Sequence, residues 1–548
     1  MPLRNDRREL LKLGSLGLLA SASAAPAYAF APKPGAASPL LFDVRTYGAI
    51  GDGKTVDTPA INKAIEAAAA AGGGTVYVPA GTYVCFSIHL KSHVDLFLAQ
   101  GSTILAADSP LPNQTTGYMG GTYDAAEPKT TYGAFQDYGH NHWHNSLLWG
   151  EDIHDLSITG PGLIYGKGLS FGADRAPRGN YPRYTAKQPG VGNKTIALKN
   201  CRNVIFRDFS ILKGGHFGLL LTGVDNLTID NLKIDTDRDG IDIDCCKNVR
   251  VSNCTVNSPW DDAICLKSSF ALGYNRSTDN VTITNCQVTG YYELGSVLDG
   301  TFKKFAADAP RPIRNGRIKL GTESNGGFRN ITISNCVFEG CMGLAIESED
   351  GALVEDITIS NITQRDLVSS PLFFRLGAGL RGPRGTGDQS TVVGTMQRII
   401  VDNFVSYNAK SQLCSILSGI PDYDIKDIKL SNVYIQHQGG DYADLVKTIP
   451  PENIDQYPDP PMFGPMPAGG FFLRHVRNLE LSHVEIAPMN PDPRPSFHLQ
   501  NVTRADFLAV TAPTTPYAFA LHQVADLRIA LSRAARDTQL ATADNHTI

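Results

Sequence analysis

A short pattern of one polar and two apolar positions recurs along most of the chain. An asparagine or aspartate is followed by an apolar residue, a variable residue and a second apolar residue. Alternating apolar positions predict strands with one buried face, and a fixed spacing is typical of stacked repeats that bury their apolar faces on one another. The pattern therefore predicts the coils of a parallel β-helix. Copies begin at Asp155, Asn203, Asn226, Asn248, Asn280, Asn330, Asp356, Asp427, Asn478 and Asp526.

A second set of segments repeats with the same spacing and places charged residues on one face. Laying residues 239–246 over residues 262–269 pairs Ile241 with Ile264 and Ile243 with Leu266, which gives an inward apolar ladder. The outward positions form two columns, and acidic and basic side chains gather in the middle coils. This arrangement predicts a cleft on one sheet face. A β-sandwich would need frequent hairpin turns, and Asn-Gly or Asp-Gly turns between alternating strands are scarce.

Three long excursions interrupt the repeat, and one helix precedes it. The helix is predicted from Thr58 to Ala71, with Asp57 or Thr58 as its N-cap, and we expect it to cover one end of the coil. The excursions lie near residues 107–190, 291–315 and 450–470, and we expect them to wall the cleft. The third is rich in proline, and a rigid surface loop is an alternative interpretation.

The N-terminus carries the features of an export signal. Two arginines, Arg7 and Arg8, precede an apolar run and an Ala-Tyr-Ala sequence, which is typical of a twin-arginine signal peptide over residues 1–29. The run is too short to span a membrane. Residues 30–41 then form a linker and residues 42–548 the β-helix domain. The expected location is the periplasm or the extracellular space.

Charge and cysteine content narrow the function classes. The net charge is −5 and the charges are mixed, so we expect no nucleic-acid partner. Cys254, Cys286 and Cys336 recur at one position of the repeat, where cysteine serves as a small apolar core residue. No paired cysteine pattern typical of zinc sites is present in the sequence, and we expect neither a metal nor a cofactor.

Carboxylates concentrate in the middle coils. The alignment stacks Asp239 on Asp262, and Asp261 comes just before. Neighbouring strands lie roughly 4.8 Å apart, so one carboxylate should raise the pKa of the other and keep one proton near neutral pH. An acid beside a base is what glycoside hydrolysis requires. Lys267 either holds one carboxylate ionised or forms a structural salt bridge, and Asp242 supports Asp239 or a sugar hydroxyl.

Histidines and aromatic residues supply further candidates. In residues 136–144, three histidines alternate with other residues, which permits a metal site, but Trp143 and a tyrosine lie among them. We prefer sugar stacking and hydrogen bonding by His142 and Trp143, with a purely structural loop as the alternative. His216 either lines a subsite or packs.

Several motifs together resemble glycoside hydrolase family 28, the polygalacturonase family, over nearly the whole chain after the signal. They are the segment from Phe42 to Ile65, GIDIDCCKNVRVSNC from Gly240, WDDAICLKS from Trp260 and GTESNGGFRNITISNC from Gly321. The resemblance implies an all-β fold, a single-stranded right-handed parallel β-helix. It further implies inverting hydrolysis of α-linked pectic sugars without a cofactor. It also implies that Asp261 is the general acid, while Asp239 and Asp262 position and deprotonate the attacking water.

Two motifs of that family are missing at their usual places. The position of its histidine falls near Asn315, and its Arg-Ile-Lys triplet should fall on residues 345–347, which read Ala-Ile-Glu. The same triplet occurs one coil earlier, at Arg317-Ile318-Lys319. Two interpretations stay open: a displaced cationic subsite, or ion pairs of Arg317 and Lys319 with Glu347 or Asp242.

The sequence therefore predicts a monomeric hydrolase of pectic polysaccharide or oligosaccharide. Exo-action is expected from the long excursions, and a rhamnogalacturonan-type chain is as good a candidate as polygalacturonan. The alternatives are a polysaccharide lyase on the same fold and a catalytically altered β-helix that binds pectin.

Overall fold

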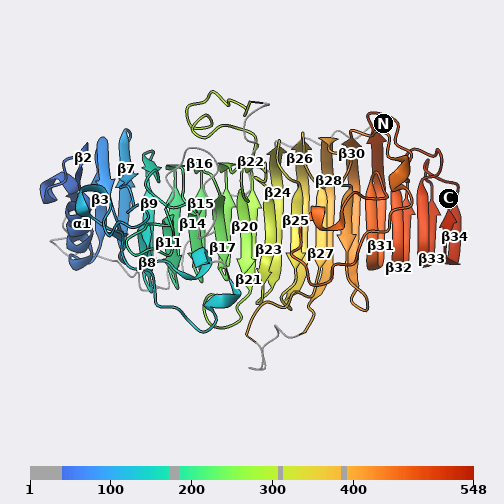
Figure 1. The fold of residues 1–548 in the computed structure, drawn as a ribbon, viewed down its shortest axis with the longest axis horizontal. Helices are drawn as coiled ribbons and strands as arrows, with labels where there is room; N and C mark the ends of the chain where they lie inside the picture. The colour runs from blue at the N-terminus through green and yellow to red at the C-terminus, as the bar shows by residue number, and fades with distance from the viewer. Residues whose placement is uncertain (1–39, 137, 172–183, 307–312, 384–391) are drawn as a thin grey trace, which may run out of the picture. The chain divides into compact units, whose positions relative to one another are not determined.

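Most strands in the described part of the chain pair in parallel with the strands one coil before and one coil after (Figure 1). The computed structural model describes residues 40–136, 138–171, 184–306, 313–383 and 392–548. The expected signal peptide at 1–29 and the linker up to residue 39 lie outside these residues. Residues Leu40–Ile548 form one unit. The first strand, β1, already begins at Leu41, so the linker ends earlier than predicted.

Three rows of strands run along the coil. The first row contains β5 (Ile88–His89), β8 (Ser146–Glu151), β11 (Lys194–Lys199), β14 (Phe217–Thr222), β17 (Asp239–Asp244), β20 (Ile264–Ser268), β23 (Ile318–Ser324), β25 (Leu344–Ser348), β27 (Leu372–Leu376) and β29 (Ser415–Ser418). The second row contains β1 (Leu41–Asp43), β3 (Gly74–Val78), β6 (Val94–Leu98), β9 (His154–Thr159), β12 (Arg202–Arg207), β15 (Asp225–Asp230), β18 (Lys247–Ser252) and β21 (Thr278–Thr284). The third row contains β2 (Asp52–Val56), β4 (Gly81–Cys85), β7 (Ser102–Ala106), β10 (Leu163–Tyr165), β13 (Ser210–Leu212), β16 (Lys233–Asp235), β19 (Thr255–Asn257) and β22 (Gln287–Thr289).

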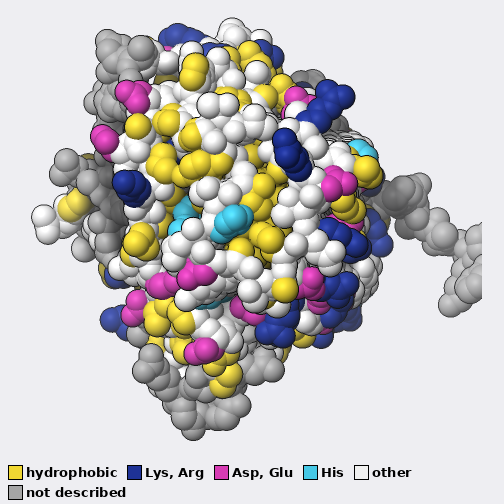
Figure 2. Space-filling model, turned by 90° about the vertical axis from the view of Figure 1, so that its right-hand side faces the viewer, with side chains coloured by type: hydrophobic (Ala, Val, Ile, Leu, Met, Phe, Trp, Pro, Cys, Tyr) yellow, Lys and Arg dark blue, Asp and Glu magenta, His cyan; other side chains and the backbone are white. Residues whose placement is uncertain are grey.

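The second and third rows merge into long strands in the C-terminal coils, because β24 pairs with both β21 and β22. The long strands are β24 (Phe328–Glu339), β26 (Leu353–Arg365), β28 (Thr395–Ala409), β30 (Ile425–His437), β31 (Phe471–Pro488), β32 (Phe497–Leu508) and β33 (Phe519–Ala530). Two antiparallel strands, β34 (Thr538–Ala543) and β35 (His546–Thr547), pair with β33 and close this end. Figure 2 looks onto this end, where hydrophobic side chains are visible among charged ones.

The helix α1 (Thr58–Ala70) packs on the N-terminal coils, as predicted, and ends one residue earlier than expected (Figure 1). Its buried face consists of alanine and isoleucine residues. Asp57 occupies the N-cap position, but its carboxylate accepts hydrogen bonds from the backbone of Ile50 and Gly51 instead of capping the helix. None of the helices in the described residues has the length and apolar character needed to span a membrane.

The interior is an apolar ladder built from the inward positions of all rows. Parallel strands buried in this way gain most of their stability from apolar area removed from water, at roughly 25 cal/mol per Å². All ten cysteines are buried, and Cys254, Cys286 and Cys336 lie in this core, as the repeat predicts. The alternation of inward and outward residues therefore determines the fold.

The excursions differ in part from the prediction. The first is not continuous, because the strands β8, β9 and β10 form an ordinary coil between two excursions, over residues 107–145 and 166–193. The second follows β22 as expected, and the third extends over residues 438–470. A fourth, unpredicted excursion lies between β27 and β28. Short 3-10 helices occur at Val44–Tyr47, Tyr118–Gly120, Gly133–Phe135, Tyr138–Asn141, Ala443–Leu445 and Pro460–Phe463.

The register of the middle coils agrees with the alignment up to one point. Ile241 pairs with Ile264, Ile243 pairs with Leu266, and Cys265 pairs with Lys319. The register then shifts between Leu266 and Ser268, so Lys267 has no directly opposite residue in β23. An irregularity of this kind redirects side chains, and here it brings Glu323 to Lys267.

Candidate active site

Asp239, Asp261 and Asp262 come together where two neighbouring strands of the first row begin. Asp239 begins β17, and Asp261 and Asp262 immediately precede Ala263 and β20. One oxygen of each carboxylate lies within 4.8 Å of the corresponding oxygens of the other two. The backbone N–H of Gly240 donates to the carbonyl of Asp262 at 3.0 Å and fixes the two coils against each other. A methyl group at Gly240 would clash with the carbonyl of Ala263, so a close approach of the coils requires this glycine.

The environment separates the protonation states of Asp239 and Asp262. Burial and the charges of Asp261 and Asp242 raise the pKa of Asp239 well above its usual range. Burial would also raise the pKa of Asp262, but Lys319 and Arg317 hold that pKa well below its usual range. The environment of Asp239 thus favours its protonated form, and that of Asp262 favours its ionised form.

Asp261 is the most exposed of the three carboxylates and is bound by Arg238. The side chain of Asp261 is 18% exposed, whereas those of Asp239 and Asp262 are 5% and 1% exposed. The guanidinium of Arg238 donates two hydrogen bonds to Asp261, from Nε at 3.0 Å and from Nη2 at 2.6 Å. A carboxylate that accepts two charge-assisted hydrogen bonds is poorly prepared to donate a proton. This contact does not favour Asp261 as the general acid.

Arg317 and Lys319 form ion pairs within the protein. Asp262 accepts from Arg317 Nε at 2.9 Å and lies 2.9 Å from Lys319 Nζ. Glu347 lies 3.3 Å from Arg317 and 3.8 Å from Lys319, and Asp459 lies 3.4 Å from Arg317. Asp242, the other partner considered, is not paired with either cation in the described residues. Of the two interpretations of the Arg-Ile-Lys triplet, the structure supports ion pairs, and Asp262 and Asp459 alone balance both charges.

Lys267 and Asp242 belong to a second buried network. The ammonium of Lys267 lies 3.2 Å from Glu323 and 3.6 Å from Asp242, and the imidazole of His140 lies 3.6 Å and 3.5 Å from Asp242 and Glu323. Burial alone would raise the pKa of Glu323, but Lys267 and His140 hold it well below its usual range. Asp242 is fully buried, so it influences Asp239 by its charge and does not offer a surface to a sugar.

His216 and Trp143 pack in the interior. The side chain of His216 is completely buried and stacks on Phe217 with a centroid distance of 4.1 Å. Trp143 is 3% exposed, donates from its indole nitrogen to Thr222 at 3.1 Å and carries Lys199 over its ring. In this structure neither residue can stack on a sugar, and sugar stacking by Trp143 gives way to the structural alternative.

His142 lies in a separate hollow of about 330 Å³. Its ring stacks on Tyr138 at 3.9 Å, and its Nδ1 donates to the carbonyl of Tyr138 at 2.8 Å. Burial lowers the pKa of His142. Asp124 and Glu127 also line this hollow, but none of the three clustered carboxylates does. A direct role of His142 at the carboxylates is therefore not supported, and a role in binding stays a prediction.

All three predicted excursions contact residues next to the carboxylate cluster, and the sequence did not predict these contacts. Trp260, next to Asp261, is edge-on to Phe171 of the first excursion at 6.2 Å and to Phe305 of the second at 5.8 Å. The third excursion contributes Asp459 to Arg317 and places the hydroxyl of Tyr457 3.4 Å from Lys319. It is therefore more than a surface loop.

Sequence reasoning missed Arg238, Glu323, His140, Tyr457 and Asp459. One signal was present: Arg238 stands between two aspartates, beside the predicted catalytic residue Asp239, and a charged residue there must find a partner. The other residues lie in excursions or at the register shift. A cation at Asp239, Asp261 and Asp262 is disfavoured because Arg238, Arg317 and Lys319 already contact these carboxylates.

Comparison with known proteins supports the fold and a group of distant relatives. Residues 41–124 match the family "Rhamnogalacturonase A/epimerase, pectate lyase-like", and residues 188–308 match "Right handed beta helix region". A probable polygalacturonase of Vitis vinifera is 26% identical over 306 residues, which are 52% of this chain and 58% of that protein. An exo-poly-alpha-D-galacturonosidase of Dickeya chrysanthemi is 26% identical over 272 residues, 43% of each chain. The chain thus spans about half the length of these relatives.

Shorter matches extend to other functions. A mannuronan C5-epimerase of Azotobacter vinelandii is 32% identical over 138 residues, 22% of this chain and 14% of that protein. The plasmin and fibronectin-binding protein A of Streptococcus pneumoniae is 40% identical over 96 residues, 17% of this chain and 13% of that protein.

Among solved structures, an exopolygalacturonase of Thermotoga maritima has a TM-score of 0.57 at 17% identity and covers 82% of this chain and 93% of its own. A family 28 exopolygalacturonase of Yersinia enterocolitica has a TM-score of 0.56 at 18% identity and covers 85% of this chain and 79% of its own. At this identity the structural likeness concerns the fold. The chain is a right-handed parallel β-helix with one short N-terminal helix, similar in sequence to pectate lyase-like proteins and distantly to polygalacturonases.

Proposed function

We propose that the protein is a glycoside hydrolase acting on a pectic polysaccharide or oligosaccharide. The observation that carries this proposal is the opposite shift of two neighbouring carboxylates: the pKa of Asp239 is raised and that of Asp262 is lowered, within 4.8 Å of the more exposed Asp261. Environments that push the pKa values of adjacent acids apart assign an acid and a base. The distant polygalacturonase relatives support the same reaction class.

The opposite directions of the two pKa shifts suggest roles that differ from those implied by the family resemblance. Asp239, whose raised pKa favours the protonated form, is the proposed donor to the leaving sugar. Asp261 is the proposed base for the attacking water, because it is the most exposed of the three and its carboxylate accepts two hydrogen bonds from Arg238. Asp262 keeps its charge for Arg317 and Lys319, and its role is to orient the water and to maintain the electrostatic field of the site.

The charge balance around Arg317 suggests the substrate. Two cations face Asp262 and Asp459, so this part of the site offers no unbalanced positive charge to a sugar carboxylate. An uncharged sugar next to the cleaved bond suits such a surface, as in a rhamnogalacturonan-type chain. The three excursions that converge on the carboxylates support exo-action, and export to the periplasm or extracellular space would bring the enzyme to this substrate.

Activated substrates and added nucleophiles distinguish the proposed roles. An Asp239→Asn variant should lose activity on pectic oligosaccharides by about 10²- to 10⁴-fold but retain activity on an aryl glycoside, whose leaving group needs no proton. An Asp261→Asn variant should be inactive on both and partly rescued by azide, which attacks without a base. If the aryl glycoside rescues Asp261→Asn and not Asp239→Asn, the roles are those implied by the family resemblance.

A digest of defined galacturonan and rhamnogalacturonan oligosaccharides tests the function itself. Early release of one small sugar from a chain end supports exo-hydrolysis, and a ladder of mid-length products contradicts exo-action. Release of an unsaturated product would show a lyase.

One observation favours a second function, binding without turnover: the guanidinium of Arg238 already binds the carboxylate of Asp261. Tight binding of every pectic oligosaccharide with no product, also in an Arg238→Thr variant, would support that function.

A further inference from the structure

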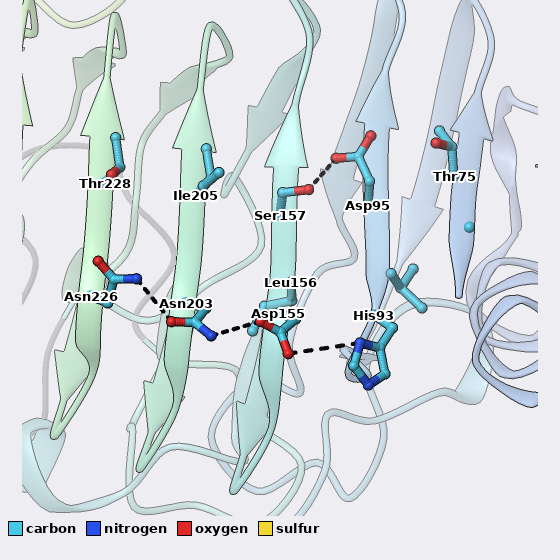
Figure 3. A pocket seen from close by; sticks show the side chains of 12 residues that line it. Thr75, His93, Asp95, Asp155, Leu156, Ser157, Asn203, Ile205, Asn226 and Thr228 are labelled. Atoms are coloured by element: carbon cyan, nitrogen blue, oxygen red, sulfur yellow. Dashed lines mark hydrogen bonds and ion pairs between the residues drawn. The ribbon is translucent and has the colours of Figure 1, made fainter. Parts of the chain in front are cut away.

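His93, His154 and Asp155 form a second cluster, on a different row of strands from the three carboxylates. His93 precedes β6, and His154 and Asp155 begin β9, which pairs with β6. One potential ligand atom of each residue lies within 4.8 Å of the others. Two of its members, His93 and Asp155, line a hollow of about 500 Å³ (Figure 3). The side chains of His93, His154 and Asp155 are 52%, 30% and 44% exposed, so an ion can reach them from solvent.

The cluster stands at the end of a hydrogen-bonded ladder formed by the repeated polar position. The side chain of Asn226 donates to that of Asn203 at 2.9 Å, and Asn203 donates to Oδ1 of Asp155 at 2.7 Å (Figure 3). A carboxylate cannot donate to the next coil, where His93 takes the ladder position. Its second oxygen, Oδ2, instead lies 2.7 Å from Nδ1 of His154 and 3.8 Å from Nδ1 of His93.

Backbone hydrogen bonds join the three residues without an ion. The N–H of His93 lies within hydrogen-bonding distance of two carbonyls, that of His154 at 3.2 Å and that of Asp155 at 2.9 Å. The two imidazole rings are nearly perpendicular, with centroids 4.9 Å apart. A site fixed by its own backbone loses little conformational entropy when it binds an ion.

In the described residues, no lysine or arginine neutralises the negative charge of Asp155. Among the described residues, its ion pairs are with His93 and His154 only. The mixed cluster of Glu127, His144 and Glu151 is different, because Lys199 already lies 2.9 Å from Glu151. Of these two mixed clusters, only the one at Asp155 lacks a lysine or arginine partner altogether in the described chain.

We propose that His93, His154 and Asp155 bind a divalent transition-metal ion, with Zn²⁺ as the best match. Two imidazoles and one carboxylate are a typical donor set for zinc, whereas Mg²⁺ and Ca²⁺ require mostly oxygen ligands. Ligand atoms on a tetrahedral zinc lie about 3.3 Å apart, and the observed 2.7 Å and 3.8 Å separations lie on either side of this value. A water molecule completes the four-coordinate site.

The ion would connect two coils across the excursion at residues 107–145. His93 lies before that excursion, and His154 and Asp155 lie after it. A metal bound only by the folded state stabilises that state. The bound ion therefore stabilises the N-terminal coils. This role does not depend on the carboxylates of Asp239, Asp261 and Asp262.

Zinc titration of the untagged, chelator-treated protein tests the proposal. Calorimetry should show one Zn²⁺ per chain and a rise in melting temperature, with no effect of Mg²⁺ or Ca²⁺. His93→Asn places the ladder residue of other coils at this position, and Asp155→Asn keeps the acceptor for Asn203, so both variants should fold and lose affinity at least about tenfold.

His483→Ala is the matched control, because His483 is an exposed histidine with the same left-handed backbone, φ 53° against 65° for His93. It should bind zinc like the wild type. The proposal fails if the wild type binds no zinc, if His93→Asn and Asp155→Asn bind it unchanged, or if His483→Ala loses as much affinity as they do. Circular dichroism of the ion-free variants establishes that a loss of binding is not a loss of fold.

Discussion

Asparagine substitutions at Asp239 and Asp262 should change stability in different ways, although the two carboxylates are neighbours. Both side chains are nearly fully buried, and asparagine has almost the shape of aspartate. The difference arises from protonation. Asparagine resembles the neutral Asp239 that the structure favours, whereas at Asp262 it removes a charge that two cations require.

The raised pKa of Asp239 gives its variant a pH dependence. Above the ordinary value of 3.8, the wild type must keep a proton that the unfolded chain releases, so its stability falls as pH rises towards the folded-state pKa. The slope is about 1.4 kcal/mol per pH unit. Asp239→Asn lacks this loss. For a coil of roughly 500 residues, with an unfolding entropy of about 1 kcal/mol/K, its melting temperature should gain about 1.4 °C on the wild type per pH unit.

The lowered pKa of Asp262 has the opposite sign. Its stabilising contribution is present above the ordinary value of 3.8 and is lost only as pH falls through the lower folded-state pKa. Asp262→Asn leaves Arg317 and Lys319 without this partner, and breaking a buried ion pair costs about 3–5 kcal/mol. The melting temperature should therefore fall by about 3–5 °C, equally at all pH values between about 5 and 8.

Differential scanning calorimetry of the wild type and both variants, at a fixed scan rate from about pH 5 to pH 8, measures these differences. If Asp239→Asn lowers the melting temperature at every pH, Asp239 is ionised in the folded protein. Asp262→Asn without a loss would show that the two cations do not depend on it. Either result refutes the assignment of the proton.

Three further predictions concern the site. Proton NMR of the first product should show inversion, because water is the proposed nucleophile; retention would indicate a carboxylate nucleophile, which a separation of about 5 Å permits. Asp459→Asn should lower the KM for acidic oligosaccharides relative to neutral ones by about 2- to 5-fold. The reason is that Arg317 loses an ion-pair partner, and its positive charge can then attract a substrate carboxylate. Asp424→Asn, which removes the partner of the exposed Arg477, is its control and should change neither KM. Trp143→Phe should lose the hydrogen bond to Thr222 and about 1 kcal/mol of stability with an unchanged KM; a raised KM at full stability would restore sugar stacking.

The coil and most of its register could be predicted from the sequence, because alternating apolar positions at a constant spacing permit only one stacking. Ile241 with Ile264 and Cys265 with Lys319 follow from this rule. The shift after Leu266 could not be predicted, since nothing in the apolar pattern of β23 marks the extra residues that bring Glu323 to Lys267.

The partners of the site cations depend on segments without a repeat. Asp459 and Tyr457 come from an excursion more than a hundred positions beyond Arg317 and Lys319, and no spacing connects them. His216 and Trp143 illustrate another limit, because histidine and tryptophan occur both in cores and in binding sites. Their burial, which decides between the two, depends on how the first excursion packs.

The central claim is hydrolysis at the carboxylate cluster. It is tested most directly by the mass of the products formed in water labelled with a heavy oxygen isotope. A hydrolase transfers one heavy oxygen from water to each newly formed sugar end, and Asp239→Asn should abolish this incorporation. Cleavage without heavy oxygen in the product, or equal incorporation by Asp239→Asn, would contradict the account.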